Sequence, residues 1–291
     1  MRSYFLEAAR QGHNQFSKYL ITLGLLVVSV FAGTAVGLLG GILYLQELPN
    51  PDAIELFLEV PSVFLFVSGW VWFSILIAIL WSEEKIHRRS ARGLLSVDGT
   101  VRLRRLGLAV LVWFGLRAIS TLVLYITAPT AYRWRGTIQE WLAFSPFILF
   151  ICLLMAIALL VFICYVMRGA SLILSRPRVL IGGLALGIGM LVAIGQDTAP
   201  MLVFLQNVFF VFFILFLVFK EECIELSVGL VAADYFYNFM FVVNETSPLP
   251  ALFDVDIELT SRTLSLVLLV VRLGSFYYWF RGQSQHLQRF F

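Results

Sequence analysis

Charged residues are scarce in this 291-residue chain, and that scarcity decides the class of protein. Asp, Glu, Lys and Arg make up 13% of the residues, about half of their usual share in soluble domains. In contrast, 60% of the residues are hydrophobic and the mean hydropathy is +0.90. This composition predicts an integral membrane protein, and we interpret residues 1–291 as a single membrane domain. The chain also lacks a basic soluble region with interleaved aromatic residues, which excludes nucleic acid as a partner.

Cysteine and histidine are also rare. The chain has three of each, namely Cys152, Cys164, Cys223, His13, His87 and His286. The cysteines lie in or beside apolar runs without a CxxC spacing, which is typical of small buried side chains and not of a disulfide or a zinc site. None of the histidines falls within a predicted membrane span, so no buried histidine base or metal ligand is expected there. We therefore predict no metal and no cofactor.

Eight apolar segments approach the roughly 20 residues that a helix needs to cross a bilayer. They cover residues 19–45, 57–81, 106–128, 141–167, 179–195, 201–219, 224–244 and 263–280. The predicted fold class is all-α, a polytopic membrane helix bundle of about eight transmembrane helices. Eight crossings place both termini on the same side of the membrane.

Basic residues concentrate in the N-terminal segment and in every second loop, whereas acidic residues prevail in the loops between them. Short loops rich in Lys and Arg stay in the cytoplasm, so both termini are expected to be cytoplasmic. The arginines of the basic loop 82–105 are Arg88, Arg89, Arg92, Arg102, Arg104 and Arg105. We expect them to form a surface for anionic lipid or an acidic partner, at about 1 kcal/mol per residue. The alternative is that they only enforce the topology.

Five polar side chains interrupt the apolar segments. They are Arg117, Glu225, Asp234, Asn238 and Arg272. Asp234 and Asn238 are one helical turn apart and share a face. A lone arginine within a membrane is costly, so each arginine is expected to face the bundle interior and pair with Glu225 or Asp234, or to extend to the interface. We interpret these pairs as structural; the alternative is that the polar side chains line a pathway.

The sequence Glu83-Glu84-Lys85-Ile86-His87-Arg88 is a candidate for chemistry. On a helix, either glutamate shares a face with His87 at the spacing of metal ligands, and Glu-Glu-x-x-x-Arg is the spacing of a known protease motif. A metal site needs three or four converging ligands. No second helix with a histidine is present to complete one, so the prediction is that this motif is neither a metal site nor a catalytic site.

Glycines recur every four residues in two segments, as Gly33, Gly37 and Gly41 and as Gly183 and Gly187. Small residues at this spacing let helices approach closely in lipid. We expect packing within the chain, with self-association as the alternative.

Short motifs along most of the chain match a known family in order and spacing. They are Ala8-Ala9-Arg10-Gln11-Gly12-His13-Asn14, His87-Arg88-Arg89, Leu103-Arg104-Arg105, Tyr132-Arg133-Trp134, Met167-Arg168-Gly169, Arg176-Pro177, Ile224-Glu225-Leu226 with Gly229, and Val243-Asn244-Glu245. On these motifs the chain resembles the CPBP family of type II CAAX-prenyl endopeptidases and bacteriocin-processing-like membrane proteins, particularly bacterial members. The resemblance implies a CPBP-like core at about 105–245 and a bacterial inner (cytoplasmic) or intracytoplasmic membrane. The predicted topology places an outer loop at 245–262.

The resemblance also implies where an active site would lie. Active members carry a Glu-Glu pair before Phe-Arg-Gly, then Phe-x-x-x-His and His-x-x-x-Asn on later helices, which together activate water. Here Met167-Arg168-Gly169 retains the arginine, whereas the other positions read Ile163 and Cys164, Ile188 and Val192, and Val231 and Tyr235. The catalytic groups are therefore replaced by mostly apolar residues, which implies a non-catalytic member of the family.

We therefore expect a non-catalytic accessory or scaffold subunit that binds other integral membrane subunits and lipids. The expected contacts are the apolar faces of 201–219 and 263–280, with Phe209, Phe210, Phe212 and Phe213, and the basic loop. Two alternatives remain open. One is a divergent intramembrane endopeptidase that uses Glu83, Glu84, His87 and Arg88. The other is a subunit that binds a lipid or a pigment.

Overall fold

The computed structural model describes most of the chain as helix. The described residues are 15–46, 61–96, 101–135, 137–172, 177–194, 200–221, 223–243, 251, 253–255 and 259–287. The helices are α2 (Phe16–Gln46), α3 (Pro61–Trp81), α4 (Arg92–Leu95), α5 (Leu103–Thr127), α6 (Ile138–Ser171), α7 (Pro177–Ile194), α8 (Pro200–Glu221), α9 (Glu225–Met240) and α10 (Leu259–Leu287). A π-helical turn, η3 (Ser82–Ile86), extends α3, and a 3₁₀ turn, η4 (Pro129–Ala131), follows α5. The predicted helical bundle is confirmed.

Six of these helices are long and apolar enough to cross a membrane. They are α2, α3 with η3, α5, α6, α8 and α10. The other two predicted spans also coincide with helices, but the apolar stretch of α7 runs only over Val179–Leu191 and α9 has 16 residues. A helix of 16 residues is about 24 Å long, which is less than the roughly 30 Å of a bilayer core.

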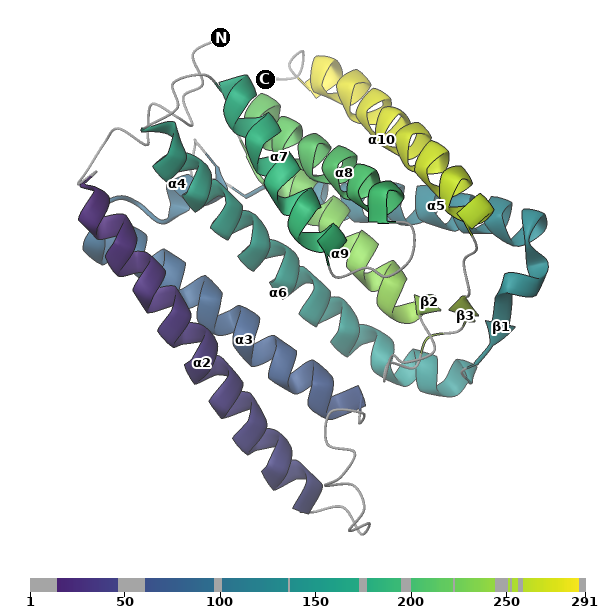
Figure 1. Ribbon diagram of the computed structural model, residues 1–291, viewed down its shortest axis with the longest axis horizontal. Helices are drawn as coiled ribbons and strands as arrows, with labels where there is room; N and C mark the ends of the chain where they lie inside the picture. Colours follow the sequence, from purple (N-terminus) through teal and green to yellow (C-terminus); the bar gives the residue numbers. More distant parts are fainter. Residues whose placement is uncertain are drawn as a thin grey trace.

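Helix α6 is the central element of the bundle. It begins at a capping box, in which the Thr137 Oγ1 accepts from the Glu140 backbone N–H at 3.3 Å and the Glu140 carboxylate accepts from the Thr137 N–H. Two N–H groups that the helix itself leaves unpaired are thereby satisfied. Helix α3 packs against one side of α6, and α9 packs against the other side. Helix α6 therefore separates the α2–α3 pair from the remaining helices (Figure 1).

The two glycine stripes, Gly33, Gly37 and Gly41 in α2 and Gly183 and Gly187 in α7, have different surroundings. A Cβ atom on Gly33 would lie 2.7 Å from Ser74 Oγ, and one on Gly37 would lie 2.8 Å from Val67 Cα. The glycines of α2 therefore allow close packing on α3, as predicted. In contrast, a Cβ atom on Gly183 or Gly187 would meet nothing within 4 Å. This stripe of α7 lies outside the packed interior.

Helix α9 is buried almost all round, since every residue from Glu225 to Ala233 is buried. It packs against α5, α6 and α8. The approach to α5 is closest at Gly229, where a Cβ atom would lie 2.6 Å from Ala109 Cβ. A helix enclosed on all sides can be shorter than a span because neighbouring helices, and not lipid, surround it.

A small sheet joins the ends of α5 and α9 to the predicted outer loop. Strand β3 (Phe253–Val255) pairs antiparallel with β1 (Tyr132–Trp134) and parallel with β2 (Val242–Val243), in the order β1-β3-β2. The sequence prediction contained no strand. Val, Tyr, Phe and Trp have high β propensity, but segments this short become strands only when tertiary structure brings a partner alongside.

Candidate functional site

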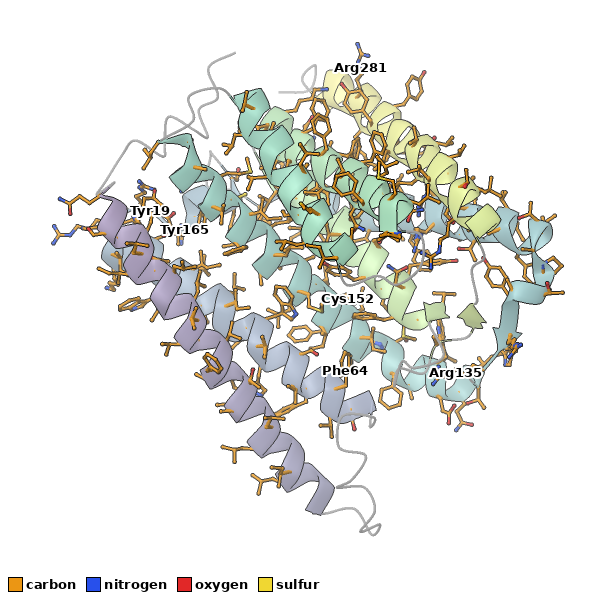
Figure 2. The ribbon with its side chains drawn as sticks, viewed as in Figure 1. Tyr19, Phe64, Arg135, Cys152, Tyr165 and Arg281 are labelled. Atoms are coloured by element: carbon orange, nitrogen blue, oxygen red, sulfur yellow. The ribbon has the colours of Figure 1, made fainter. Side chains whose placement is uncertain are left out.

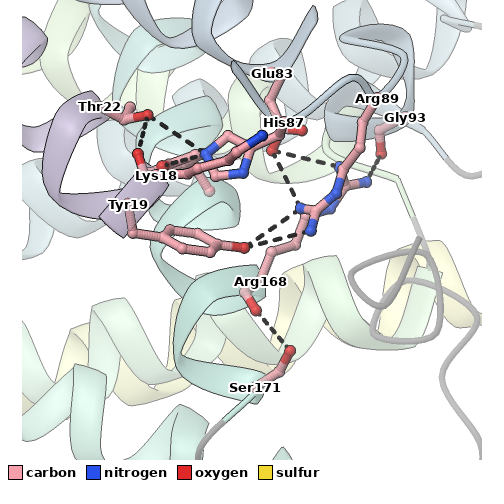
Figure 3. A network of polar contacts seen from close by, with 10 residues as sticks. Lys18, Tyr19, Thr22, Glu83, His87, Arg89, Gly93, Arg168 and Ser171 are labelled. Atoms are coloured by element: carbon pink, nitrogen blue, oxygen red, sulfur yellow. Dashed lines mark hydrogen bonds and ion pairs between the residues drawn. The ribbon is translucent and has the colours of Figure 1, made fainter. Parts of the chain in front are cut away.

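A network of buried and half-buried polar side chains lies where α2, η3 and α6 meet (Figure 3). We call it the polar cluster. Its members are Lys18, Tyr19, Thr22, Glu83, His87, Arg89, Tyr165, Arg168 and Ser171, with the Gly93 carbonyl. Figure 2 shows Tyr19 and Tyr165 side by side at this end of α2 and α6, and their ring centroids are 5.5 Å apart.

The π-helical turn creates the cluster by turning two side chains inward. In this turn the His87 N–H donates a hydrogen bond to the Ser82 carbonyl, five residues earlier, at 3.0 Å. The next residue, Arg88, adopts a positive φ of 54°. Glu83 and His87 are consequently 0% exposed, whereas Glu84 and Arg88 are exposed. Residues 82–86, where the basic loop was predicted to begin, therefore continue the helix of α3. Single π-turns inside helices are frequent at functional sites.

Two arginines face the buried Glu83 carboxylate. Glu83 Oε1 lies 3.8 Å from Arg168 Nη1 and 3.9 Å from Arg89 Nη1. These separations exceed hydrogen-bond length, and among the described residues the carboxylate has no hydrogen-bond donor. The attraction is therefore electrostatic, and it is strengthened by the low dielectric of the interior. Arg168 also donates to the Gly93 carbonyl, which ties α6 to the segment after η3.

His87 is surrounded by hydroxyl groups. Its Nε2 lies 2.9 Å from Tyr165 Oη and 3.4 Å from Thr22 Oγ1, and its ring centroid lies 4.5 Å from that of Tyr19. A hydroxyl group donates or accepts according to the imidazole tautomer. In the part of the chain that the structure describes, no three His, Cys, Asp or Glu side chains come together as metal ligands.

The candidate set Glu83, Glu84, His87 and Arg88 is not brought together, because only Glu83 and His87 face inward. The structure instead places Glu83 against Arg168, the arginine that the family resemblance singled out, and His87 against Tyr165. The sequence interpretation missed Thr22 and Tyr165. The only signal for Thr22 was its polarity within an apolar segment.

One arginine of the predicted lipid or partner surface lies elsewhere. Arg89 is buried, faces Glu83 and donates to Tyr19 Oη at 3.4 Å, so its assignment to that surface is wrong. Arg105 is half-buried and forms a 2.5 Å ion pair with Glu221. The other members of the set are exposed, namely Arg88, Arg92, Arg102 and Arg104.

The positions at which the resemblance places a lost site are occupied by packed side chains. Ile163, Cys164 and Val231 are buried in the main hydrophobic core, and the half-buried Tyr235 packs against it. Val192 lies in α7, but its side chain is outside the described part of the structure. Cys164 is one turn before Arg168 on α6, so this packed region adjoins the polar cluster.

A second polar group lies between α5, α9 and α10. Asp234 Oδ1 is 3.2 Å from Arg117 Nε and accepts from Trp113 Nε1 at 3.0 Å. Asn238 Nδ2 donates to Asp234 Oδ2 at 3.3 Å, and the Arg117 guanidinium donates to Asn238 Oδ1. The predicted pairing of Arg117 with Asp234 is confirmed.

The other two predicted intramembrane residues behave differently. Glu225 starts α9 and accepts from the Arg102 backbone N–H at 3.1 Å, so it is not the partner of a mid-span arginine. Arg272 is 6% exposed and lies over the Trp113 ring at 5.3 Å. Its Nε and Nη1 have no acceptor among the described residues. The prediction that Arg272 pairs with a carboxylate is therefore wrong.

Compared with known proteins, the sequence matches no family model, no curated protein and no solved structure. The resemblance to the CPBP family thus stays a prediction from the motifs themselves.

Proposed function

We propose that this chain is a non-catalytic integral membrane protein that binds partner proteins as an accessory or scaffold subunit of a membrane complex. The observation that carries the proposal is the polar cluster, whose acid, bases and hydroxyl groups contact one another. Glu83 faces Arg89 and Arg168, and His87 contacts Tyr165. A catalytic acid or base has to reach a reacting group on a substrate. Here the same groups connect α2, η3 and α6, which favours a structural role.

The proposal includes a catalytically degenerate member of the CPBP family. It is supported by the apolar packing of Ile163, Cys164 and Val231, since a water-activating site needs polar groups at those positions. Interiors are close-packed, so side chains of this kind fill the space that a substrate would need.

We further propose about eight spans with both termini in the cytoplasm, in a bacterial inner or intracytoplasmic membrane. In support, α2 begins and α10 ends on the same side of the bundle (Figure 1). Arg281 lies at that side and Arg135 at the opposite one (Figure 2). The exposed arginines of the basic loop would then face the anionic lipids of the cytoplasmic leaflet.

The partner surface we propose is the side formed by α7, α8 and α10, which pack in that order. Phe209 and Phe212 on α8 are 44% and 46% exposed, whereas Phe210 and Phe213 point inward against Trp113 and Phe276. The outward glycine stripe of α7 would let a partner helix approach closely.

The test is purification from the native membrane in a mild detergent, with mass spectrometry of what stays bound. We expect other membrane subunits in stoichiometric amounts with the wild type and their loss with Gly187→Leu. The matched control is Leu39→Phe on the exposed face of α2, which should retain them. A bare wild-type monomer would contradict the scaffold proposal, and a co-purified lipid or pigment would favour the ligand-binding alternative.

An endopeptidase with a divergent site is the second candidate function. It is favoured by the burial of Glu83 and His87 on one turn, with Arg168 3.8 Å from the carboxylate. Peptide cleavage in proteoliposomes that is lost in His87→Gln and retained in Glu84→Gln would establish it, because Glu84 is exposed. Absence of cleavage by the wild type across prenylated and unprenylated peptides would remove it.

A further inference from the structure

Three charged side chains lie away from the helix ends, two of them half-buried and one buried. Charged residues of the described helices gather near the ends of helices or candidate spans, and Arg117, Asp234 and Arg272 are the exceptions. Two cations and one anion leave an excess of one positive charge. In lipid such an excess is costly, and natural membrane proteins pair or neutralise it.

Asp234 cannot compensate both arginines, because its oxygens are already engaged. Oδ1 receives the Trp113 indole N–H at 3.0 Å and faces Arg117 Nε at 3.2 Å, while Oδ2 receives the Asn238 amide at 3.3 Å. Among the described residues no carboxylate lies within ion-pair distance of Arg272. Asp234 therefore forms its ion pair with Arg117 and acts on Arg272 only from beyond ion-pair distance.

Arg272 has donors without acceptors. Only 6% of the residue is exposed, and the enclosed Nε and Nη1 atoms have no hydrogen-bond partner among the described residues. The face of Trp113, 5.3 Å from the guanidinium carbon, is a favourable contact, and the Asp234 charge attracts the group from beyond ion-pair distance. A cation–π contact attracts the charge but accepts none of the five N–H donors in the way an oxygen or a halide does.

We propose that Arg272, with the neighbouring positive charge of Arg117, binds one monovalent anion, a carboxylate or a halide. One negative charge matches the excess, and either acceptor can receive the Arg272 N–H groups. The head group of a bilayer phospholipid does not fit, because Arg272 is about ten residues from either end of the span Arg262–Arg281, which is about 15 Å of helix. This site does not depend on the proposed scaffold function.

The anion has two possible sources with the same chemistry. A small anion would enter from water, whereas the carboxylate of a fatty acid would enter from the bilayer with its chain along the apolar side chains.

The experiment measures the unfolding temperature of the purified full-length protein in a non-ionic detergent. Sodium chloride and sodium decanoate are titrated separately, with ionic strength held constant by sodium sulfate. A ligand that binds only the folded state raises the unfolding temperature with the logarithm of its concentration. We expect such a rise with at least one probe, and its loss in Arg272→Gln. Arg281→Gln, which removes an exposed charge from the same helix, should retain it.

A rise with chloride identifies a free anion, and a rise with decanoate alone identifies a carboxylate from the membrane. Either result supports the site. A wild-type unfolding temperature that is independent of both probes overturns it, and so does an equal rise in Arg272→Gln. If Arg272→Gln does not fold, Arg272→Met is used in its place. The wild-type titration tests the site even without a variant, because an unfolding temperature that responds to neither probe contradicts it.

Discussion

The Glu83 carboxylate lies 3.8 Å from the Arg168 guanidinium, and this contact joins the end of the α3 segment to the end of α6. Both side chains are buried, and Arg89 faces the same carboxylate from the following segment. The pair therefore holds together two helices that lie far apart in sequence.

Removing the Glu83 charge should destabilise the protein strongly. Glu83→Gln leaves the buried guanidinium groups of Arg89 and Arg168 without their carboxylate, and breaking a buried pair costs about 3–5 kcal/mol. Glu84→Gln, which changes an exposed neighbour, should change the free energy of unfolding by less than about 0.5 kcal/mol. Denaturant unfolding in detergent measures both. Equal stability of the two variants would show that the buried pair does not form.

The His87 and Tyr165 contact should be measurable as a coupling. Tyr165→Phe removes the hydroxyl 2.9 Å from His87 Nε2, so we expect a loss of about 0.5–1.5 kcal/mol. Because the two side chains share one hydrogen bond, the effects of His87→Phe and Tyr165→Phe should not add. Strict additivity in a double-mutant cycle would contradict the contact.

A matched pair of glycine substitutions tests the packing of the two stripes. In Gly37→Ala the new methyl group would meet the Val67 backbone at 2.8 Å, and overpacking of this kind costs about 1–3 kcal/mol. Gly183→Ala meets open space and lies within α7, so it should stabilise the helix by up to about 1 kcal/mol. We therefore expect a higher unfolding temperature for Gly183→Ala than for Gly37→Ala. The reverse order would contradict the α2–α3 packing.

Cys223 should resist alkylation at neutral pH. Burial is the main cause that raises the pKa of this thiol to about 12 from an ordinary value of 9.0. The reactive thiolate is then about one part in ten thousand at pH 8. We expect slow maleimide labelling of Cys223 until the protein unfolds, whereas a cysteine at the exposed Val101 should react quickly. Because the folded pKa is the higher one, this group stabilises the fold below pH 9 and its contribution falls as the pH rises towards 12. Rapid labelling of the folded protein at pH 8 would contradict the burial.

The sequence was a good guide to those features that depend on neighbouring residues along the chain. Runs of about 20 apolar residues predicted the helices because each backbone group in lipid must be paired within its own helix. The contact of Arg117 with Asp234 was also foreseeable, since few partners exist for a charge within an apolar segment. The length of α9 was not foreseeable, because a helix enclosed by α5, α6 and α8 does not need to be as long as the bilayer core is thick.

By itself the sequence thus determined a bundle of apolar helices, six of them able to cross a membrane, and the residues able to pair inside it. Tertiary structure alone decided which of them meet. The sequence placed Glu83 and His87 in a basic loop because their partners Thr22, Tyr165 and Arg168 lie in other helices. The π-helical turn that points them inward is a local irregularity stabilised by those distant contacts. Arg272 likewise lacks a carboxylate because Asp234 is already engaged by Arg117, Trp113 and Asn238, and such competition for one acceptor exists only in three dimensions.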